Sequence, residues 1–297
     1  IYGGTYHTKN QWLEVLRKIQ NVYEINKLQL LNFADEIELG IKEINHFEYT
    51  DETELFKPEL IQNDIFFWSG NWDLINGGEN QTQKFITPSK FNYIQNYQYL
   101  DNDLMIKNYF RSTLQNIANS GVVDHLEGGF YRYSVDPEWR IPHFEKMLYD
   151  NAQLLSLYSN AYKEFKTPLF KSTVYKTYTF LQEKMENTKG GYYSSIDADN
   201  DLGEGRYYTF NIEEIKKVGG QDFNMILDFY QIDLDKPVEG YFYHLRKINN
   251  LNSFLKKYSI TSNQFDSKLK TWEKKYFLIK KNRHSPNVDK KIITSWN

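Results

Sequence analysis

The amino-acid sequence predicts a mainly α-helical fold of the (α/α) toroid type, with a short β-hairpin insertion. Apolar residues recur at helical spacing along most of the 297-residue chain, which is typical of amphipathic helices. Gly-Gly pairs beginning at residues 77, 128 and 190 are separated by 51 and 62 residues, enough for two long helices and their loops. Only residues 191–196 and 206–210 show clear strand character, and their Gly- and Asp-rich flanks favour a hairpin.

The predicted helices begin near the N-terminus. Thr8 is a suitable N-cap for a first helix, in which Trp12, Leu16 and Ile19 share one face. A second amphipathic helix covers residues 26–45. The same spacing predicts further helices at residues 54–68, 89–97, 102–120, 144–165, 169–185, 212–218, 223–230 and 263–281.

The Gly-Gly pairs indicate tight turns, because glycine adopts positive φ without a steric penalty. Two further pairs, at residues 3 and 219, do not keep the spacing of the other three. Hairpins of this length exceed the usual solenoid repeats and suit a toroid, whose Gly-rich loops gather at one mouth. We therefore expect a cleft walled by the loop residues themselves.

Composition excludes several classes of function. The net charge of −3 argues against a general nucleic-acid binder, and the lysines between residues 268 and 281 predict a solvated helix face. No apolar run is long enough to span a membrane. The absence of cysteine excludes disulfides, thiolate catalysis and Cys-ligated zinc within this chain, and favours a cytoplasmic location. No phosphate-loop, dinucleotide or zinc-protease motif occurs, so we predict no cofactor and no metal.

Aromatic residues make up 17% of the chain and include 24 tyrosines, which suits the wall of a wet, sugar- or peptide-binding groove. The alternative is that a biased genome composition places many tyrosines in the core and on the surface, without any ligand-binding role. The chain begins without Met and ends at Ser295-Trp296-Asn297 without a closing turn. We therefore expect both ends to be cut from a longer polypeptide.

Residues 124–150 form the best candidate site, because ionisable and aromatic side chains are densest there. Pro142 predicts a helix beginning at His143 or Phe144, which would place His143, Met147 and Asp150 near one face. Carboxylates and imidazoles in a cleft can act as general acids and bases. Structural hydrogen bonds that tie loops together are the alternative. The candidate catalytic residues are His143, Glu145, Asp150 and His125, and the candidate substrate-binding residues are Arg132, Tyr133, Asp136 and Trp139.

Two other segments are weaker candidates. The spacing of Asp197, Asp199 and Asp201 resembles the start of a calcium loop, but an EF-hand would need Gly and Glu where Leu202 and Tyr208 stand. An irregular cation site, a carboxylate facing the cleft and an acidic turn between two strands remain alternatives, and Asp197 and Asp199 are candidate ligand contacts. Trp296 is a further candidate, because it can stack on a sugar or form a hydrophobic plug.

These motifs resemble one known family. The runs GGFYRYSVD at residues 128–136 and PHFEKMLYDNAQ at residues 142–153, with Trp139 between them, closely resemble the spermatogenesis-associated protein 20-like family. Its bacterial members are usually called thioredoxin domain-containing proteins. The resemblance continues in Asp197-Ala198-Asp199, in Glu204-Gly205 and from Asp289 to Asn297.

The resemblance implies a domain plan. Family members join a thioredoxin-like domain to a barrel resembling six-hairpin glycosidases and sugar epimerases. Residues 1–25 would then be the tail of the thioredoxin-like domain, and residues 26–297 the first part of the barrel. A Cys-x-x-Cys segment would precede residue 1. This chain departs from the family at Gln83-Lys84-Phe85-Ile86, where Pro-Lys-Phe-Pro is usual, and at Tyr131, where histidine is common. If these positions line the cleft, ligand preference has changed.

Two functions follow as hypotheses. The first is a carbohydrate-active barrel that binds, epimerises or hydrolyses a sugar, with His143 as general acid or base, Glu145 and Asp150 orienting it, and Arg132 binding substrate oxygens. The second is a non-catalytic interaction barrel coupled to a thioredoxin-like redox or folding domain. The expected partners are a carbohydrate or other small molecule and the remainder of the same polypeptide, without nucleic acid or membrane.

Overall fold

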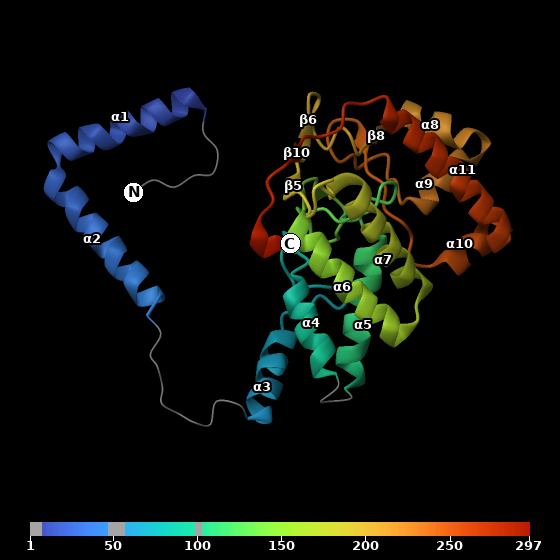
Figure 1. Cartoon of the computed structure of the whole chain (residues 1–297), viewed down its shortest axis with the longest axis horizontal. Helices are drawn as coiled ribbons and strands as arrows, with labels where there is room; N and C mark the ends of the chain where they lie inside the picture. The colour runs from blue at the N-terminus through green and yellow to red at the C-terminus, as the bar shows by residue number, and fades with distance from the viewer. Residues whose placement is uncertain (1–7, 47–56, 99–102) are drawn as a thin grey trace. The chain divides into compact units, whose positions relative to one another are not determined.

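The computed structural model describes residues 8–46, 57–98 and 103–297, and it is mainly helical, as predicted (Figure 1). The chain divides into two compact units, Ile1–Asn63 and Asp64–Asn297. The predicted boundary after residue 25, between the tail of a thioredoxin-like domain and the barrel, stays a prediction. No helix in the described part of the chain is both long and apolar enough to cross a bilayer.

The first unit contains the two predicted N-terminal helices, α1 (Lys9–Ile25) and α2 (Lys27–Ile44). Thr8 caps α1 as predicted, because its side chain accepts from the Gln11 amide while the Gln11 side chain accepts from Thr8. Asn26 separates the helices with a backbone conformation outside the helical region. Part of the third predicted helix lies outside the described residues, and α3 is observed at Pro58–Ser69.

Four long helices of the second unit pack side by side (Figure 1). Their shared core includes the apolar residues Phe110, Leu114, Leu154 and Leu157, which are fully buried. Tyr158 brings its hydroxyl into this core and donates to the Leu114 carbonyl oxygen at 2.9 Å, which satisfies a buried polar group. The helices are α4 (Pro88–Tyr97), α5 (Leu104–Asn119), α6 (Leu148–Phe165) and α7 (Pro168–Phe180), which continues as a π-turn, η1 (Leu181–Met185).

A second helical group follows in the sequence and encloses an aromatic core that includes Phe229, Tyr230, Phe265, Trp272 and Tyr276. Its members are α8 (Ile212–Gly219), η2 (Gly220–Asp222), α9 (Phe223–Phe229), α10 (Leu251–Tyr258) and α11 (Ser262–Lys281), and the last short helix of the chain is η3 (Thr294–Trp296). The sequence analysis did not predict α10.

Short antiparallel strands join the helices. One sheet has the order β1 (Lys84–Phe85), β2 (Tyr133–Ser134), β3 (Pro142–His143), and another has the order β10 (Val288–Asp289), β5 (Ser195–Ile196), β4 (Lys146–Met147). Two further pairs are β6 (Asp199–Asn200) with β7 (Gly203–Glu204), and β8 (Phe210–Asn211) with β9 (Phe242–Tyr243). The predicted hairpin between residues 191–196 and 206–210 is wrong, because β5 pairs with β4 and β10 while β8 pairs with β9. The hairpin is the acidic β6–β7 turn between them.

The regularly spaced Gly-Gly pairs form equivalent turns, and both glycines of each pair have positive φ. In the first two, an aspartate one helical turn before the pair accepts from the two following amides: Asp73 from Ile75 and Asn76, and Asp124 from Leu126 and Glu127. Gly128 illustrates why glycine is needed, since a Cβ there would lie 2.3 Å from the Lys176 carbonyl oxygen.

A buried lysine completes each of these two turns. Lys84 pairs with Asp73 and donates to the Gly77 carbonyl oxygen at 2.9 Å, and Lys146 pairs with Asp124 at 2.9 Å and donates to the Gly128 carbonyl oxygen at 2.8 Å. The third turn has Asn187 in place of the aspartate, with its side chain accepting from the Lys189 amide. The sequence repeat is therefore a structural repeat.

Candidate functional site

The segment from Pro142 to Met147 is extended, so alternate side chains point to opposite sides. Phe144 and Lys146 are buried, whereas His143 and Glu145 are partly exposed. The prediction of a helix from His143 or Phe144 is wrong, because α6 begins only at Leu148. The alternation still places His143 and Glu145 together, and the first turn of α6 then adds Asp150.

The partly exposed side chains Arg132, His143, Glu145, Asp150 and Glu204 form what we call the acid–base cluster. A guanidinium nitrogen of Arg132 lies 3.1 Å from Glu145 Oε2. Imidazole Nδ1 of His143 lies 2.7 Å from Glu204 Oε1, and Nε2 lies 3.7 Å from Glu145 Oε2. The contact with Glu204 is thus a hydrogen bond and that with Glu145 a looser ion pair. The backbone supports the cluster, since the Arg132 amide donates to the Glu145 carbonyl oxygen at 2.9 Å.

The histidine and its carboxylate neighbour favour each other's charge. Glu145, and with it Glu204, raises the pKa of His143 above its usual value. His143, together with Arg132, lowers the pKa of Glu145, although burial opposes this shift. Glu145 is therefore ionised at neutral pH, and its charge favours the protonated form of the imidazole.

Asp150 is the unusual member of the cluster. Burial raises its pKa to about 7, the nearby Glu145 charge adds to the rise, and Arg132 only partly opposes it. Its Oδ2 atom is buried and has no hydrogen-bond partner in the described structure. A carboxyl group that titrates near neutral pH beside an ionised carboxylate is the usual electrostatic arrangement of an acid–base pair.

An aromatic row runs from the cluster across the first sheet. Phe85, Tyr133 and His143 are successive cross-strand partners on β1, β2 and β3. The rings of Phe85 and Tyr133 are 4.7 Å apart, and those of Tyr133 and His143 are stacked at 5.0 Å. Phe85 is half exposed and also lines a cavity of about 270 Å³.

The three remaining candidate ligand contacts, Asp197, Asp199 and Trp296, have different surroundings. Burial and then Glu145 raise the pKa of Asp197, which places this carboxyl group within the electrostatic reach of Glu145. Asp199 is exposed and lies opposite Glu204 in the β6–β7 hairpin. Trp296 packs edge-on against Tyr149, with ring centroids 4.9 Å apart, and against the core around Leu148. The structure therefore shows the hydrophobic-plug arrangement of Trp296.

Three other predicted site residues form hydrogen bonds within the protein. His125 is buried, its Nε2 lies 2.9 Å from the Ser120 carbonyl oxygen, and burial lowers its pKa well below the usual value. Asp136 accepts from three amides of its own loop. Trp139 is buried and donates its indole N–H to the Gly77 carbonyl oxygen at 3.1 Å.

The two positions at which this chain departs from the family pattern also differ in their surroundings. Tyr131 is fully buried, so the position where histidine is common does not line a cleft in this chain. Lys84, Phe85 and Ile86, by contrast, line the cavity beside β1. Among the described residues, no group of three or more potential metal ligands is present.

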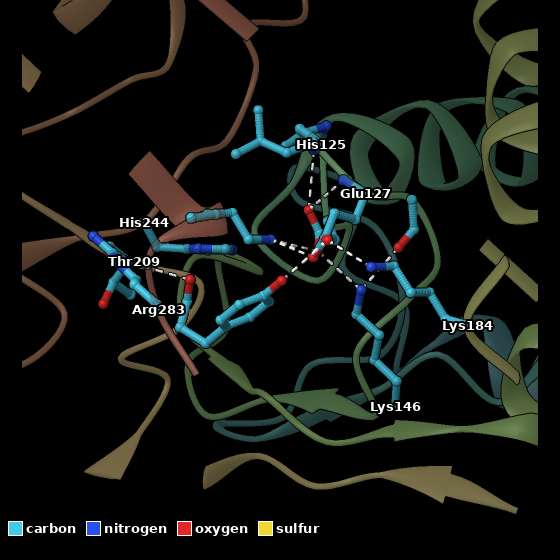
Figure 2. Close-up of polar contacts among 12 residues, drawn as sticks. His125, Glu127, Lys146, Lys184, Thr209, His244 and Arg283 are labelled. Atoms are coloured by element: carbon cyan, nitrogen blue, oxygen red, sulfur yellow. Dashed lines mark hydrogen bonds and ion pairs between the residues drawn. The ribbon is translucent and has the colours of Figure 1, made fainter. Parts of the chain in front are cut away.

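Sequence reasoning missed a charge network around Glu127, most of it buried (Figure 2). Lys280 of α11 was expected on a solvated face, and this is wrong: its side chain is buried and lies 2.7 Å from Glu127 and 3.4 Å from Asp124. Lys146 pairs with Asp124 from the other side, and Lys184 pairs with Glu127 at 3.0 Å. The network ties α11 to the second Gly-Gly turn, and its only sequence signal was the Asp-Gly-Gly-Lys pattern shared with the first turn.

No family model matches the chain. Among solved structures, it resembles a D-mannose isomerase (16% identity, TM-score 0.42, covering 51% of this chain and 42% of that one). It also resembles a sugar epimerase from a ruminal bacterium (12% identity, TM-score 0.42, covering 78% and 76%).

Sequence relatives are more informative. Spermatogenesis-associated protein 20 of Mus musculus is 26% identical over 99% of this chain, and that of Homo sapiens is 25% identical over 99%. An uncharacterized protein of Caenorhabditis elegans is 30% identical over 63% of this chain. The chain spans 42% of the length of both mammalian relatives. The resemblance to the spermatogenesis-associated protein 20-like family, which the central motif predicted, is confirmed over almost the whole chain.

Proposed function

We propose that the acid–base cluster catalyses reversible proton transfer on a carbohydrate, as in an epimerisation or isomerisation. The observation that carries the proposal is the partly buried Asp150 carboxyl group, whose Oδ2 atom is buried without a hydrogen-bond partner in the described structure and whose pKa is about 7, beside His143 and Glu145. A reversible reaction needs one group that removes a proton and another that returns it. Groups with pKa values near the working pH do this best.

Asp150 and His143 can fill these two roles. The pKa of Asp150 is about 7, and that of His143 is raised from its usual value of 6.5. At neutral pH the Asp150 carboxyl group is therefore present in both protonation states, and the raised pKa of His143 favours its protonated form. Glu204 holds Nδ1 of His143, which leaves Nε2 as the nitrogen that can exchange a proton with a ligand.

Arg132 supplies the positive charge that such a reaction needs. When a proton leaves the carbon next to a carbonyl group, the electron pair moves onto the carbonyl oxygen. A fixed guanidinium group stabilises this developing negative charge. Arg132 is held by Glu145 and remains about 40% exposed, so part of its hydrogen-bonding capacity is free for a ligand.

The experiment is a panel of aldoses, ketoses and disaccharides offered to the full-length protein, with products identified by NMR. His143→Gln and Asp150→Asn should each lower kcat by about 10²–10⁴-fold, the usual contribution of a positioned acid or base. His284→Gln is the matched control, because His284 forms a similar imidazole–carboxylate contact with Asp201 but is exposed. The control should keep wild-type activity.

Two results would contradict the proposal. One is the absence of both binding, measured by calorimetry, and turnover for every sugar in the panel, which would favour the non-catalytic interaction barrel. The other is full activity of His143→Gln and Asp150→Asn, provided that both variants keep the wild-type circular dichroism spectrum.

Glycoside hydrolysis is the second candidate. Its specific support is the pair formed by Asp150, with its raised pKa, and Glu145, with its lowered pKa. A glycosidase uses one protonated and one ionised carboxyl group across the bond that breaks. The same panel separates the two reactions, since hydrolysis cleaves disaccharides and leaves monosaccharides unchanged.

A further inference from the structure

A cavity of about 270 Å³ lies beside the first sheet and outside the acid–base cluster. This volume is just below the range of drug-sized pockets, so it suits a ligand of one ring. Aromatic rings and polar side chains line it together, and they come from the first Gly-Gly turn, β1 and α4. The residues that matter here are Trp68, Glu79, Gln81, Phe85, Lys90 and Tyr109.

The polar side of the cavity places donors and acceptors next to one another. Glu79 Oε1 accepts from the Trp68 indole N–H at 2.8 Å and pairs with Lys90, while Oε2 accepts from the side-chain amide nitrogen of Gln81 at 3.0 Å. Burial alone would raise the pKa of Glu79, but these contacts outweigh it and lower the pKa, so the carboxylate is ionised. Vicinal hydroxyl groups need this combination, because each hydroxyl both donates and accepts.

The aromatic side of the cavity is rigid. Tyr109 stacks on Trp72 with ring centroids 3.9 Å apart, and Trp72 packs edge-on against Trp68. Thr87, at the N-terminus of α4, is held at a φ of 47°, which is strained for a β-branched residue. Such strain persists only where the surroundings determine the backbone, as they do at ligand clamps.

The aromatic row connects this cavity to the acid–base cluster. Phe85 lines the cavity and contacts Tyr133, and Tyr133 stacks on His143. All three residues are cross-strand partners in one sheet, so the path between the two places is short and fixed. A chain of sugar rings can follow it, because aromatic rings offer apolar surfaces and Tyr133 adds a hydroxyl group.

We propose that this cavity is a second sugar-binding subsite and that the substrate is an oligosaccharide of at least two rings. The inference rests on the proposed function. One terminal ring reacts at the acid–base cluster, while another ring of the same molecule binds among Phe85, Glu79 and Lys90. The subsite holds the substrate and takes no part in the proton transfer.

The test is calorimetry on the full-length protein with gluco- and mannotrioses of different linkages and with their parent hexoses. Phe85→Ala and Glu79→Gln should weaken trisaccharide binding by about tenfold and leave hexose binding within a factor of about two. Phe85 is half exposed, so its replacement should not unfold the protein, and thermal unfolding checks this. Tyr175→Ala removes an exposed aromatic ring elsewhere and is the matched control.

The outcomes separate the two proposals. If the wild-type protein binds no sugar of either length, the proposed function fails and this inference fails with it. If hexoses bind or react but trisaccharides bind no better, or if Phe85→Ala and Glu79→Gln leave a trisaccharide preference intact, the second subsite alone is refuted. Loss of trisaccharide preference in both variants but not in Tyr175→Ala supports it.

Discussion

Replacing Asp124 by alanine is expected to lower the free energy of unfolding by about 3–5 kcal/mol, the usual cost of breaking a buried ion pair from one side. Asp124 is only 3% exposed and lies 2.9 Å from Lys146 and 3.4 Å from Lys280. Without it, two buried ammonium groups share Glu127 as their remaining carboxylate in this network (Figure 2). The substitution also removes the acceptor for two amides of the Gly-Gly turn.

Urea unfolding at neutral pH measures this loss, and two variants dissect it. Asp124→Asn keeps an acceptor for the turn, as Asn187 does in the third turn, and should still lose most of the stability because the charge is gone. Glu213→Ala breaks the exposed pair with Lys216 and should cost less than about 1 kcal/mol. Equal effects for Asp124→Ala and Glu213→Ala would show that the buried network contributes nothing special.

Asp150→Asn is expected to stabilise the protein at pH 8 by up to about 4 kcal/mol, since each unit of pKa shift is equivalent to about 1.4 kcal/mol. The pKa of Asp150 is about 7 in the folded protein, against 3.8 in a model compound. Folding therefore favours the protonated form. The wild-type contribution is fully present below pH 3.8 and is lost as the pH rises through about 7, whereas asparagine does not ionise.

Denaturant unfolding of wild type and Asp150→Asn across this pH range checks the sign as well as the size. The difference between the two proteins should grow as the pH rises and level off above about 7. Asp199→Asn, which removes an exposed carboxylate from the β6–β7 hairpin, should follow the wild-type curve. A difference between wild type and Asp150→Asn that does not change with pH would mean that folding does not shift the pKa of Asp150. If Asp150→Asn is both more stable and inactive, the protein keeps the Asp150 carboxyl group for activity at a cost in stability.

The sequence correctly predicted those features that depend on residues only a few positions apart. Thr8 and Gln11 cap α1 through contacts three residues apart, and the glycine pairs form positive-φ turns because few other residues can. Most helices follow from apolar spacing for the same reason. The mistakes occur where pairing across the chain decides. Residues 143–147 have a helical pattern, but His143 and Met147 pair with β2 and β5, which the sequence does not show.

The candidate site shows the same limit. Arg132, His143, Glu145 and Asp150 lie close in the sequence and gather as expected, although by strand alternation followed by a helix start. Glu204 reaches His143 from 61 residues away, and Lys280 reaches Glu127 from 153 residues away. A lysine at the end of an amphipathic helix resembles a surface lysine unless its buried partners are known. Trp139 was a candidate substrate contact because it lies in the segment 124–150, but its indole N–H donates to the Gly77 carbonyl oxygen in the first Gly-Gly turn.

The most direct test of the central claim is solvent hydrogen exchange into sugars. The full-length protein is incubated with the sugar panel in D₂O, and deuterium on carbon is followed by NMR. If the cluster transfers protons, a sugar that binds should acquire deuterium next to its carbonyl carbon, at a rate that depends on pH around 7 and is lost in Asp150→Asn. The account is contradicted if sugars bind without exchange at any pH, or if Asp150→Asn exchanges at the wild-type rate.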